Sequence, residues 1–276
     1  MTVGNFLASA TRTLNTAGIE TARLDCLILL EDALATDRSH ILAHLETEIP
    51  RATEVELNTK IVQRATHLPL AYLRGKAMFY GREFKVTPDV LVPRPESESM
   101  ITLLKTLPLS AKANIADIGT GTGCLGITAA LELASARVWL VDIDNKALAV
   151  AKDNAVQYGI DAPVVWSDLL SQISADSFEV ILANLPYVPE QYPLNKAAEH
   201  EPKLAIFAGQ DGLDVYRHLW QQIGKMSRKP RFVITESLAS QHAPLTTLAE
   251  NSEYSLLATE GLAQCFQTTQ LAPHQA

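Results

Sequence analysis

Residues 113–236 alternate between short apolar segments and predicted helices, and this alternation constrains the fold more than any other feature of the chain. Short apolar segments rich in β-branched residues predict buried strands. The expected strands lie at residues 114–118, 137–142, 164–166, 178–183 and 231–235. Alternation of this kind predicts an α/β fold, with a parallel sheet and helices on both of its faces.

A glycine-rich loop follows the first of these strands, with the sequence Asp117-Ile118-Gly119-Thr120-Gly121-Thr122-Gly123. Glycines at this point let the backbone approach a ligand and turn into the next helix. Asp142, at the end of the second strand, is placed to accept hydrogen bonds from a ribose diol. Because residues 121–126 also satisfy G-x-G-x-x-G, the loop alone fits either a dinucleotide enzyme or one that uses S-adenosylmethionine.

Two further observations favour S-adenosylmethionine. The carboxylate of Asp117 suits a ligand with an ammonium and a sulfonium group and would repel a pyrophosphate, while Asp168 after the third strand supplies an acceptor for an adenine amino group. The second observation is a polar cluster after the fourth strand, which hydride transfer does not need. We therefore expect methyl transfer rather than hydride transfer.

That polar cluster is Asn184-Leu185-Pro186-Tyr187. Pro186 has no N–H to donate, so it ends the strand, and it pushes Leu185 into an extended conformation that fixes the direction of its carbonyl. A planar NH2 group could donate one hydrogen to the Asn184 side-chain oxygen and the other to the Leu185 carbonyl, with the Tyr187 ring over its face. The alternative is a strand that ends in a proline turn, with a core tyrosine and an asparagine bonded to its own loop.

The part of the chain before the alternating region predicts two smaller units. Residues 1–74 have helical periodicity and predict a helical bundle, with His40 and His44 one turn apart but no third metal ligand nearby. Residues 75–98 contain two short strands around a glycine turn and then Arg94 between two prolines, which is typical of a rigid segment or a linker. The remainder, residues 99–276, is the expected catalytic domain.

Composition and charge exclude several classes of protein. The net charge of −8 argues against direct nucleic-acid binding, which depends on phosphate neutralisation. The three cysteines are far apart and odd in number, so neither a disulfide framework nor a cysteine-based zinc site is expected. The N-terminus lacks a signal-peptide pattern and no apolar run reaches membrane-spanning length. We expect a cytoplasmic protein without a metal or a membrane anchor.

With these residues in view, nearly the whole chain resembles the HemK/PrmC family, the protein-(glutamine-N5) methyltransferases that modify peptide chain release factors. The motifs that carry the resemblance are residues 69–75, 79–84, 91–96, 117–123, 201–205 and 209–213. Leu185 stands where the family motif N-P-P-Y has its first proline, Ser97-Glu98 replaces Thr-Glu, and Leu169 replaces a frequent aromatic residue. The resemblance implies a Rossmann-like class I S-adenosylmethionine-dependent methyltransferase sheet, preceded by a small helical domain and a connecting β-hairpin.

The resemblance also implies an activity and a set of site residues. S-adenosylmethionine would donate a methyl group to the side-chain amide N5 of the glutamine in a Gly-Gly-Gln motif of a release factor, the expected partner. The implied cofactor-binding residues are Asp117, Gly119, Thr120, Gly121, Thr122, Gly123, Asp142, Asp168, Leu169 and Asn184. Catalysis falls to Asn184, Leu185, Pro186 and Tyr187, which together with Arg94 would also bind the substrate.

Three alternatives remain open from the sequence. An adenine N6-methyltransferase acting on rRNA or DNA shares the cofactor loop, and N-L-P-Y is similar to the motif of rRNA adenine dimethyltransferases. A ribosomal-protein glutamine methyltransferase would share the chemistry. A non-catalytic adaptor that merely binds a nucleotide fits the helical bundle but leaves the cluster at residues 184–187 unexplained.

Overall fold

The computed structural model describes residues 1–173 and 178–270, which form two compact units. The first consists of Met1–Lys76 together with Leu194–His200, a short segment from the second half of the chain. The second contains the rest of the described chain, from Ala77 to Pro193 and from Glu201 onward. The division into domains at residues 74 and 98 that the sequence suggests stays a prediction.

The first unit is a helical bundle around an apolar core. Its helices are α1 (Val3–Thr16), α2 (Ala22–Leu34), α3 (Arg38–Ala43), α4 (Arg51–Ala65) and α5 (Leu70–Arg74). The three- and four-residue spacing of apolar positions places Phe6, Leu14 and Leu30 in the interior, where each is fully buried. A buried ion pair joins α2 to α4, because the Arg64 guanidinium lies 2.7 Å from the Asp25 carboxylate.

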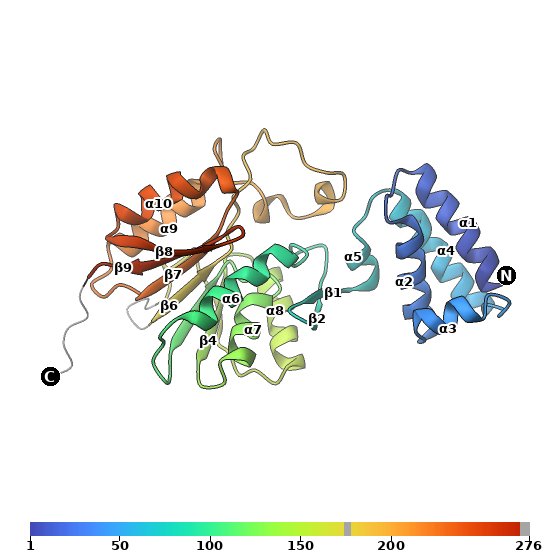
Figure 1. Ribbon diagram of the computed structural model, residues 1–276, viewed down its shortest axis with the longest axis horizontal. Helices are drawn as coiled ribbons and strands as arrows, with labels where there is room; N and C mark the ends of the chain where they lie inside the picture. Colours follow the sequence, from blue (N-terminus) through green and yellow to red (C-terminus); the bar gives the residue numbers. More distant parts are fainter. Residues whose placement is uncertain (174–177, 271–276) are drawn as a thin grey trace. The chain divides into compact units, whose positions relative to one another are not determined.

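The second unit contains a seven-stranded sheet (Figure 1). The order of its strands is β5-β4-β3-β6-β7-β9-β8. The strands are β3 (Asn114–Ile118), β4 (Arg137–Asp142), β5 (Val164–Trp166), β6 (Val180–Ala183), β7 (Phe232–Glu236), β8 (Tyr254–Glu260) and β9 (Ala263–Thr268). The five strands from β5 to β7 are parallel, as the alternation predicts. Strand β9 is antiparallel to both of its neighbours, β7 and β8. Its pair with β8 is a hairpin, because only residues 261–262 connect the two strands, too short a link for a parallel crossover.

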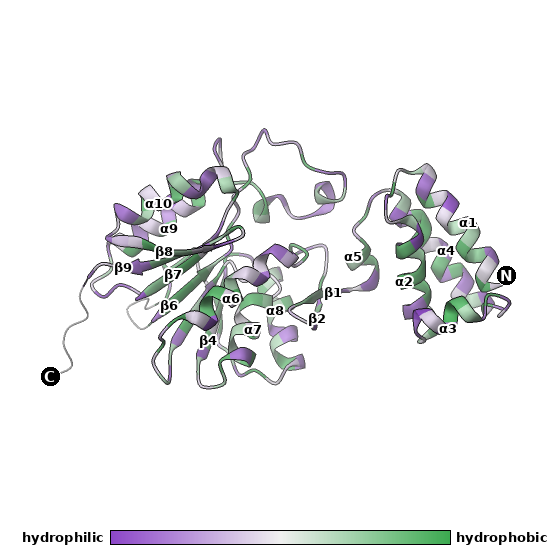
Figure 2. Cartoon of the chain, in the orientation of Figure 1, coloured by the Kyte–Doolittle hydropathy of each residue, from purple (hydrophilic) through white to green (hydrophobic). Residues whose placement is uncertain are grey.

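Helices cover both faces of the sheet (Figure 1). On one face lie α6 (Glu98–Thr106), α7 (Cys124–Glu132) and α8 (Asn145–Gln157), and on the other α9 (Asp214–Gly224) and α10 (His242–Glu250). Successive residues of a central strand enter the two cores in turn, so Leu182 packs on one face and Ile181 on the other. Figure 2 accordingly shows the central strands in the colour of hydrophobic residues.

A hairpin and several short helical turns complete the second unit. The hairpin strands β1 (Lys76–Phe79) and β2 (Arg82–Lys85) lie where the sequence predicts them, around Gly81. The single turns of 3-10 helix are η1 (Pro95–Ser97), η4 (Lys203–Ala205) and η5 (Ala239–Gln241), while η3 (Ala198–His200) belongs to the first unit. No helix among residues 1–173 and 178–270 is long and apolar enough to cross a membrane.

The register of the sheet determines which loops meet at its carboxyl edge. Ile118 of β3 pairs with Val141 of β4 on one side and with Ala183 of β6 on the other. Ala183 in turn pairs with Thr235 of β7. The next residues along these strands are therefore neighbours, in the order Asp142, Gly119, Asn184 and Glu236. The chain reverses its direction of winding between β3 and β6, and such a switch point is where α/β sheets bind ligands.

Candidate active site

A cavity of about 380 Å³ opens at this edge of the second unit. Its walls come from the loops after β3, β4, β5 and β6, and from two segments that precede α6 and α9. The site residues predicted from the sequence that line it are Arg94, Gly119, Thr120, Gly121, Thr122, Asp142, Asp168, Leu169, Asn184, Leu185 and Pro186. Asp117, Gly123 and Tyr187 lie behind this wall rather than in it.

The glycine loop forms one wall with backbone that other residues could not easily adopt. Gly119 and Gly121 have φ values of +70° and +54°, in the left-handed region that favours glycine. A Cβ on Gly119 would lie 2.9 Å from Leu185 Cδ2, whereas a Cβ on Gly121 would meet no atom within 4 Å. The loop therefore packs against residue 185 at one point and leaves open space at the next. Gly123 faces inward, because a Cβ there would lie 2.9 Å from Ile127 Cδ1.

Asp142 ties the glycine loop to the end of β4. Its Oδ2 accepts a hydrogen bond from the Gly121 N–H and its Oδ1 accepts one from the Asp144 N–H, each at 2.9 Å. Burial raises the pKa of this carboxyl, and these backbone hydrogen bonds oppose the shift. Because each carboxylate oxygen can accept more than one hydrogen bond, Asp142 retains acceptor capacity toward the cavity, where a diol could donate.

Asp117 organises the loop from behind, which differs from the direct ligand contact that the sequence suggests. Its side chain is buried, with 1% of the residue exposed, and Oδ2 accepts hydrogen bonds from Thr120 Oγ1 at 2.6 Å and from the Gly126 N–H at 2.9 Å. Its other oxygen, Oδ1, is enclosed and has no hydrogen-bond partner among the described residues. A cofactor-binding role for Asp117 stays a prediction, and what the geometry shows is support of the loop.

Asp117 should make the stability of the protein depend on pH. Burial raises the pKa of its carboxyl from 3.8 to about 6. The folded protein therefore binds this proton more tightly than the unfolded chain, and stability falls as the pH rises through that interval. Asp117→Asn removes the ionisation, so the difference in unfolding free energy between variant and wild type should grow by about 3 kcal/mol from about pH 3 to about pH 7. Urea denaturation of both proteins across this range measures it, and parallel curves would contradict the prediction.

The other end of the cavity is formed after β5 by Asp168 and Leu169. Leu169 is buried and has a φ of +52°, a strained conformation for a side chain with a Cβ. Gln222 of α9 holds this turn, since its Oε1 accepts from the Leu170 N–H at 2.7 Å and its Nε2 donates to the Asp168 carbonyl at 3.4 Å. The strained turn thus presents one carboxylate and one apolar side chain to the cavity, a combination suited to a base with an exocyclic amino group.

The residues after β6 form the part of the cavity next to the glycine loop. Asn184 and Leu185 both line it, and Asn184 Nδ2 donates to Ser97 Oγ at 2.8 Å. The hydroxyl of Tyr216 fixes the backbone here, because it accepts from the Leu185 N–H at 3.3 Å and lies 2.9 Å from the Ala183 carbonyl. The same hydroxyl lies 2.6 Å from the carbonyl of Glu236 on the neighbouring strand.

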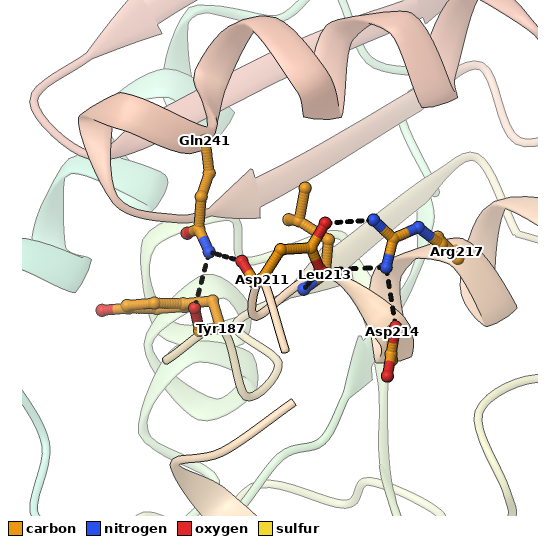
Figure 3. A network of polar contacts seen from close by, with 6 residues as sticks. All are labelled: Tyr187, Asp211, Leu213, Asp214, Arg217 and Gln241. Carbon is orange, nitrogen blue, oxygen red and sulfur yellow. Dashed lines mark hydrogen bonds and ion pairs between the residues drawn. The ribbon is translucent and has the colours of Figure 1, made fainter. Parts of the chain in front are cut away.

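Tyr187 is anchored on both its side chain and its backbone. Its hydroxyl donates to Glu236 Oε1 at 2.9 Å, and burial together with that carboxylate raises the pKa of the phenol. Its carbonyl accepts from Gln241 Nε2 at 2.7 Å, and Gln241 also donates to the Asp211 carbonyl at 2.8 Å (Figure 3). Asp211 is in turn paired with Arg217 (Figure 3). The aromatic contact with a bound amide that the sequence predicts for this ring stays a prediction.

Arg94 lines the cavity from the segment that precedes α6. Its Nη2 donates to both carboxylate oxygens of Glu201 at 2.7 Å, and Glu201 itself is buried. Burial raises the pKa of Glu201, and the guanidinium opposes that shift. The positive charge of Arg94 is therefore already matched, and its evident structural task is to join residues 91–94 to residues 201–205. Its substrate-binding role stays a prediction.

The charge of the cavity suits a cationic ligand and therefore fits S-adenosylmethionine, which carries an ammonium and a sulfonium group. The carboxylates that line it are Asp89, Asp142, Asp144, Asp168 and Asp214. Among the described residues of the wall there is one guanidinium, that of Arg94, and it is paired with Glu201. A pyrophosphate would be repelled by this surface. Among residues 1–173 and 178–270 no group of three or more histidine, cysteine or acidic side chains could hold a metal ion.

Sequence reasoning missed four residues that shape the site. They are Ser97, Tyr216, Glu236 and Gln241. Each belongs to a different segment and touches the cluster at residues 184–187 through a hydrogen bond across the fold. Only Glu236 had a local signal in the sequence. It directly follows an apolar segment, which is the pattern that identified Asp142.

Comparisons with known proteins agree with this geometry. The PrmC N-terminal domain matches residues 5–75, and the methyltransferase small domain matches residues 98–200. A release factor glutamine methyltransferase from Bacillus anthracis is 36% identical over 220 residues, which cover 76% of this chain and 77% of the relative. One from Moorella thermoacetica is 38% identical over 224 residues, covering 79% of each.

The structure of a methyltransferase from Pyrococcus furiosus has a similar fold, with a TM-score of 0.51 and 16% identity. The similarity covers 76% of this chain and 94% of that one. The predicted fold class, enzyme class, cofactor and family are thereby confirmed. The chain belongs to the HemK/PrmC family of release factor glutamine methyltransferases, S-adenosylmethionine-dependent enzymes with a class I methyltransferase fold.

Proposed function

We propose that this protein transfers a methyl group from S-adenosylmethionine to the side-chain amide nitrogen of the glutamine in a Gly-Gly-Gln motif of peptide chain release factors, in the cytoplasm. The observation that carries the proposal is the position of Asn184 and Leu185. Both residues line the cavity beside the glycine loop, where the register of β3 and β6 brings the two loops together. A planar amide bound there lies next to the cofactor wall.

An amide nitrogen is a weak nucleophile, and this determines what the site must do. Its lone pair is delocalised, so the reaction depends on holding the nitrogen in place and polarising it. Asn184 Oδ1 and the Leu185 carbonyl accept the two hydrogens of the substrate NH2 group, and Tyr187 packs near it. When bound, S-adenosylmethionine supplies an electrophilic methyl group on a positively charged sulfur. No strong base is required, because the methylated amide loses its extra proton readily.

The remaining site residues have supporting roles in this proposal. The loop at residues 119–122 binds the cofactor, and Asp142 accepts hydrogen bonds from the ribose hydroxyls of the cofactor. Asp168 and Leu169 bind the adenine, and Asp117 keeps the loop in shape from behind. Arg94 and Glu201 hold the wall past which the substrate enters. We call the pair of acceptors formed by Asn184 Oδ1 and the Leu185 carbonyl the amide clamp. Leu185 replaces the first proline of the family motif but retains the carbonyl that the amide clamp needs, so the chemistry is preserved.

The partner is a release factor, as the family name of the relatives says of those proteins. A nucleic-acid substrate would have to approach a cavity whose wall carries five carboxylates and a single, paired guanidinium. We assign the grip on the protein substrate to the helical unit at Met1–Lys76. A truncated protein that lacks residues 1–70 and still modifies its partner at full rate would contradict that assignment.

The Tyr187 segment should be sensitive to a single added methyl group. Gly212 has a φ of +79°, and a Cβ there would lie 2.1 Å from the Tyr187 carbonyl oxygen. Gly212→Ala must therefore displace residue 187, and we expect a loss of turnover of about 100-fold. The matched control is Gly159→Ala. Gly159 also has a positive φ, of +64°, but a Cβ there would meet no atom within 4 Å. This control should cost about 1 kcal/mol in stability and leave turnover unchanged. Steady-state assays and thermal denaturation of both variants measure these effects.

The proposed function is tested by offering the purified protein isotope-labelled S-adenosylmethionine with either a release factor or ribosomal RNA. We expect label in the release factor, located by tandem mass spectrometry on the glutamine side chain of the Gly-Gly-Gln motif. A release factor in which that glutamine is replaced by alanine should take up no label. Label in the RNA, or on another side chain of the release factor, would overturn the proposal.

A further inference from the structure

The carboxylate of Glu236 is buried directly beside the amide clamp. Glu236 ends β7, and since Thr235 pairs with Ala183, it stands next to Asn184 at the carboxyl edge of the sheet. The residue is 1% exposed, and it does not line the cavity. A buried carboxylate that cannot reach the substrate has no direct part in the transfer, although its desolvation is costly. It therefore calls for another explanation.

The Glu236 carboxylate lies next to polar side chains of the active site. Oε1 accepts from the Tyr187 hydroxyl at 2.9 Å. Burial raises the pKa of the Glu236 carboxyl and the nearby charge of Glu96 adds to this shift, while the polar side chains of Ser97, Tyr187 and Asn184 oppose it. The other oxygen, Oε2, is enclosed and has no partner in good hydrogen-bond geometry among the described residues. In its ionised form Glu236 is an acceptor-only group, and it lies beside three polar side chains of the active site that can donate to it.

An acceptor behind Asn184 determines which end of its side-chain amide faces the cavity. The NH2 and C=O ends of an asparagine have nearly the same shape, so hydrogen bonds decide between the two orientations. Asn184 Nδ2 already donates to Ser97 Oγ at 2.8 Å, on the side of Glu236. With that end held inside, Oδ1 is the atom left for a ligand. In the opposite orientation Oδ1 would face a carboxylate, and a substrate NH2 would meet a donor instead of an acceptor.

We propose that Glu236 is a positioning residue that holds the Asn184 amide group inward and thereby presents Asn184 Oδ1 to the substrate nitrogen. The inference rests on the proposed function for its catalytic consequence, but the orientation itself is a property of the protein without substrate. Glu236 acts through Asn184 and leaves the cofactor wall untouched. It should therefore influence turnover and not cofactor affinity.

The substitution that tests this is Glu236→Gln, which keeps the shape and removes one acceptor. When the glutamine oxygen accepts from Tyr187, its NH2 group faces Asn184 and draws Oδ1 inward. We expect kcat to fall on the order of 100-fold, with KM for the release factor and Kd for S-adenosylmethionine within about twofold of wild type. Glu236→Asp keeps the charge and should recover part of the lost kcat. The matched control is Glu260→Gln, the same change at an exposed position of β8, which should leave kcat unchanged.

A second measurement needs neither activity nor a variant of Glu236. In wild-type protein labelled with ¹⁵N-asparagine, the side-chain NH2 resonances of Asn184, assigned by their loss in Asn184→Ala, should exchange slowly with water because the group is hydrogen-bonded inside. Rapid exchange in wild type would overturn the inference, as would a Glu236→Gln protein with normal kcat or with equal losses of kcat and cofactor affinity. If wild type shows slow exchange but methylates no release factor, the proposed function fails while the orientation stands.

Discussion

Replacement of Asn184 by alanine should reduce methyl transfer by about 1000-fold or more and leave the affinity for S-adenosylmethionine within about twofold of wild type. The side chain lies at the cavity wall next to the glycine loop and supplies one of two acceptors for the substrate amide. Its removal takes away an interaction that matters most when the nitrogen attacks, so the loss should appear in kcat. Single-turnover transfer and calorimetric titration with the cofactor measure the two quantities separately.

A matched control for this variant is Asn251→Ala, because Asn251 is an exposed residue at the end of α10. It should transfer methyl at the wild-type rate. If Asn184→Ala instead lost cofactor affinity and turnover by equal factors, Asn184 would be a cofactor ligand and the clamp would be the wrong description. Normal turnover in Asn184→Ala would show that the substrate amide does not need the Asn184 acceptor. The amide would then have to bind at a different site.

Replacement of Asp142 by alanine should raise the Kd for S-adenosylmethionine by about 100-fold. The carboxylate has two tasks at once, since it accepts from the Gly121 N–H at 2.9 Å and faces the cavity where the ribose hydroxyls would donate. Hydrogen bonds to a charged acceptor are each worth about 1.5–3 kcal/mol, so the loss of two at the lower end of this range predicts an effect of about 100-fold. Equilibrium titration with the cofactor or with its demethylated product measures it.

Two further aspartate substitutions separate the causes. Asp142→Asn keeps the shape and one acceptor oxygen, so its Kd should lie between those of wild type and the alanine variant. Asp161→Ala removes an exposed carboxylate just after α8 and should leave cofactor binding unchanged. An unchanged Kd in Asp142→Ala would show that the carboxylate serves the loop alone, and the ribose would then need another partner.

The parts of this structure that the sequence predicts are those that depend on local signals. Short apolar segments identify the parallel strands, and closely spaced glycines identify the loop after β3, where Gly119, Gly121 and Gly123 adopt positive φ. Polar residues that directly follow strands identify Asp142 and Asn184. Because parallel strands end at one edge, these predictions also bring the residues together. The cavity contains them as expected.

What the sequence could not supply is the identity of partners across the fold. Arg94 between two prolines indicates a rigidly presented side chain, but its pairing with Glu201 depends on how residues 201–205 return to the cavity. Asp117 follows the pattern of a ligand-binding acid, yet helix α7 packs over it and turns it inward. Glu236 meets Asn184 through the register of β6 and β7, and register is a tertiary property that no short pattern encodes.

The hydroxyl of Tyr216 has a consequence for how a substrate gains access. This single oxygen contacts main-chain groups of both β6 and β7 at their ends, at Ala183, Leu185 and Glu236. Separation of these two strand ends would leave four buried main-chain polar groups without their hydrogen-bond partner, so it is energetically costly. We therefore expect the cofactor and the substrate glutamine to enter past residues 91–94 and 201–205. These segments are joined by the Arg94–Glu201 ion pair and stiffened by prolines, and they are not part of the sheet.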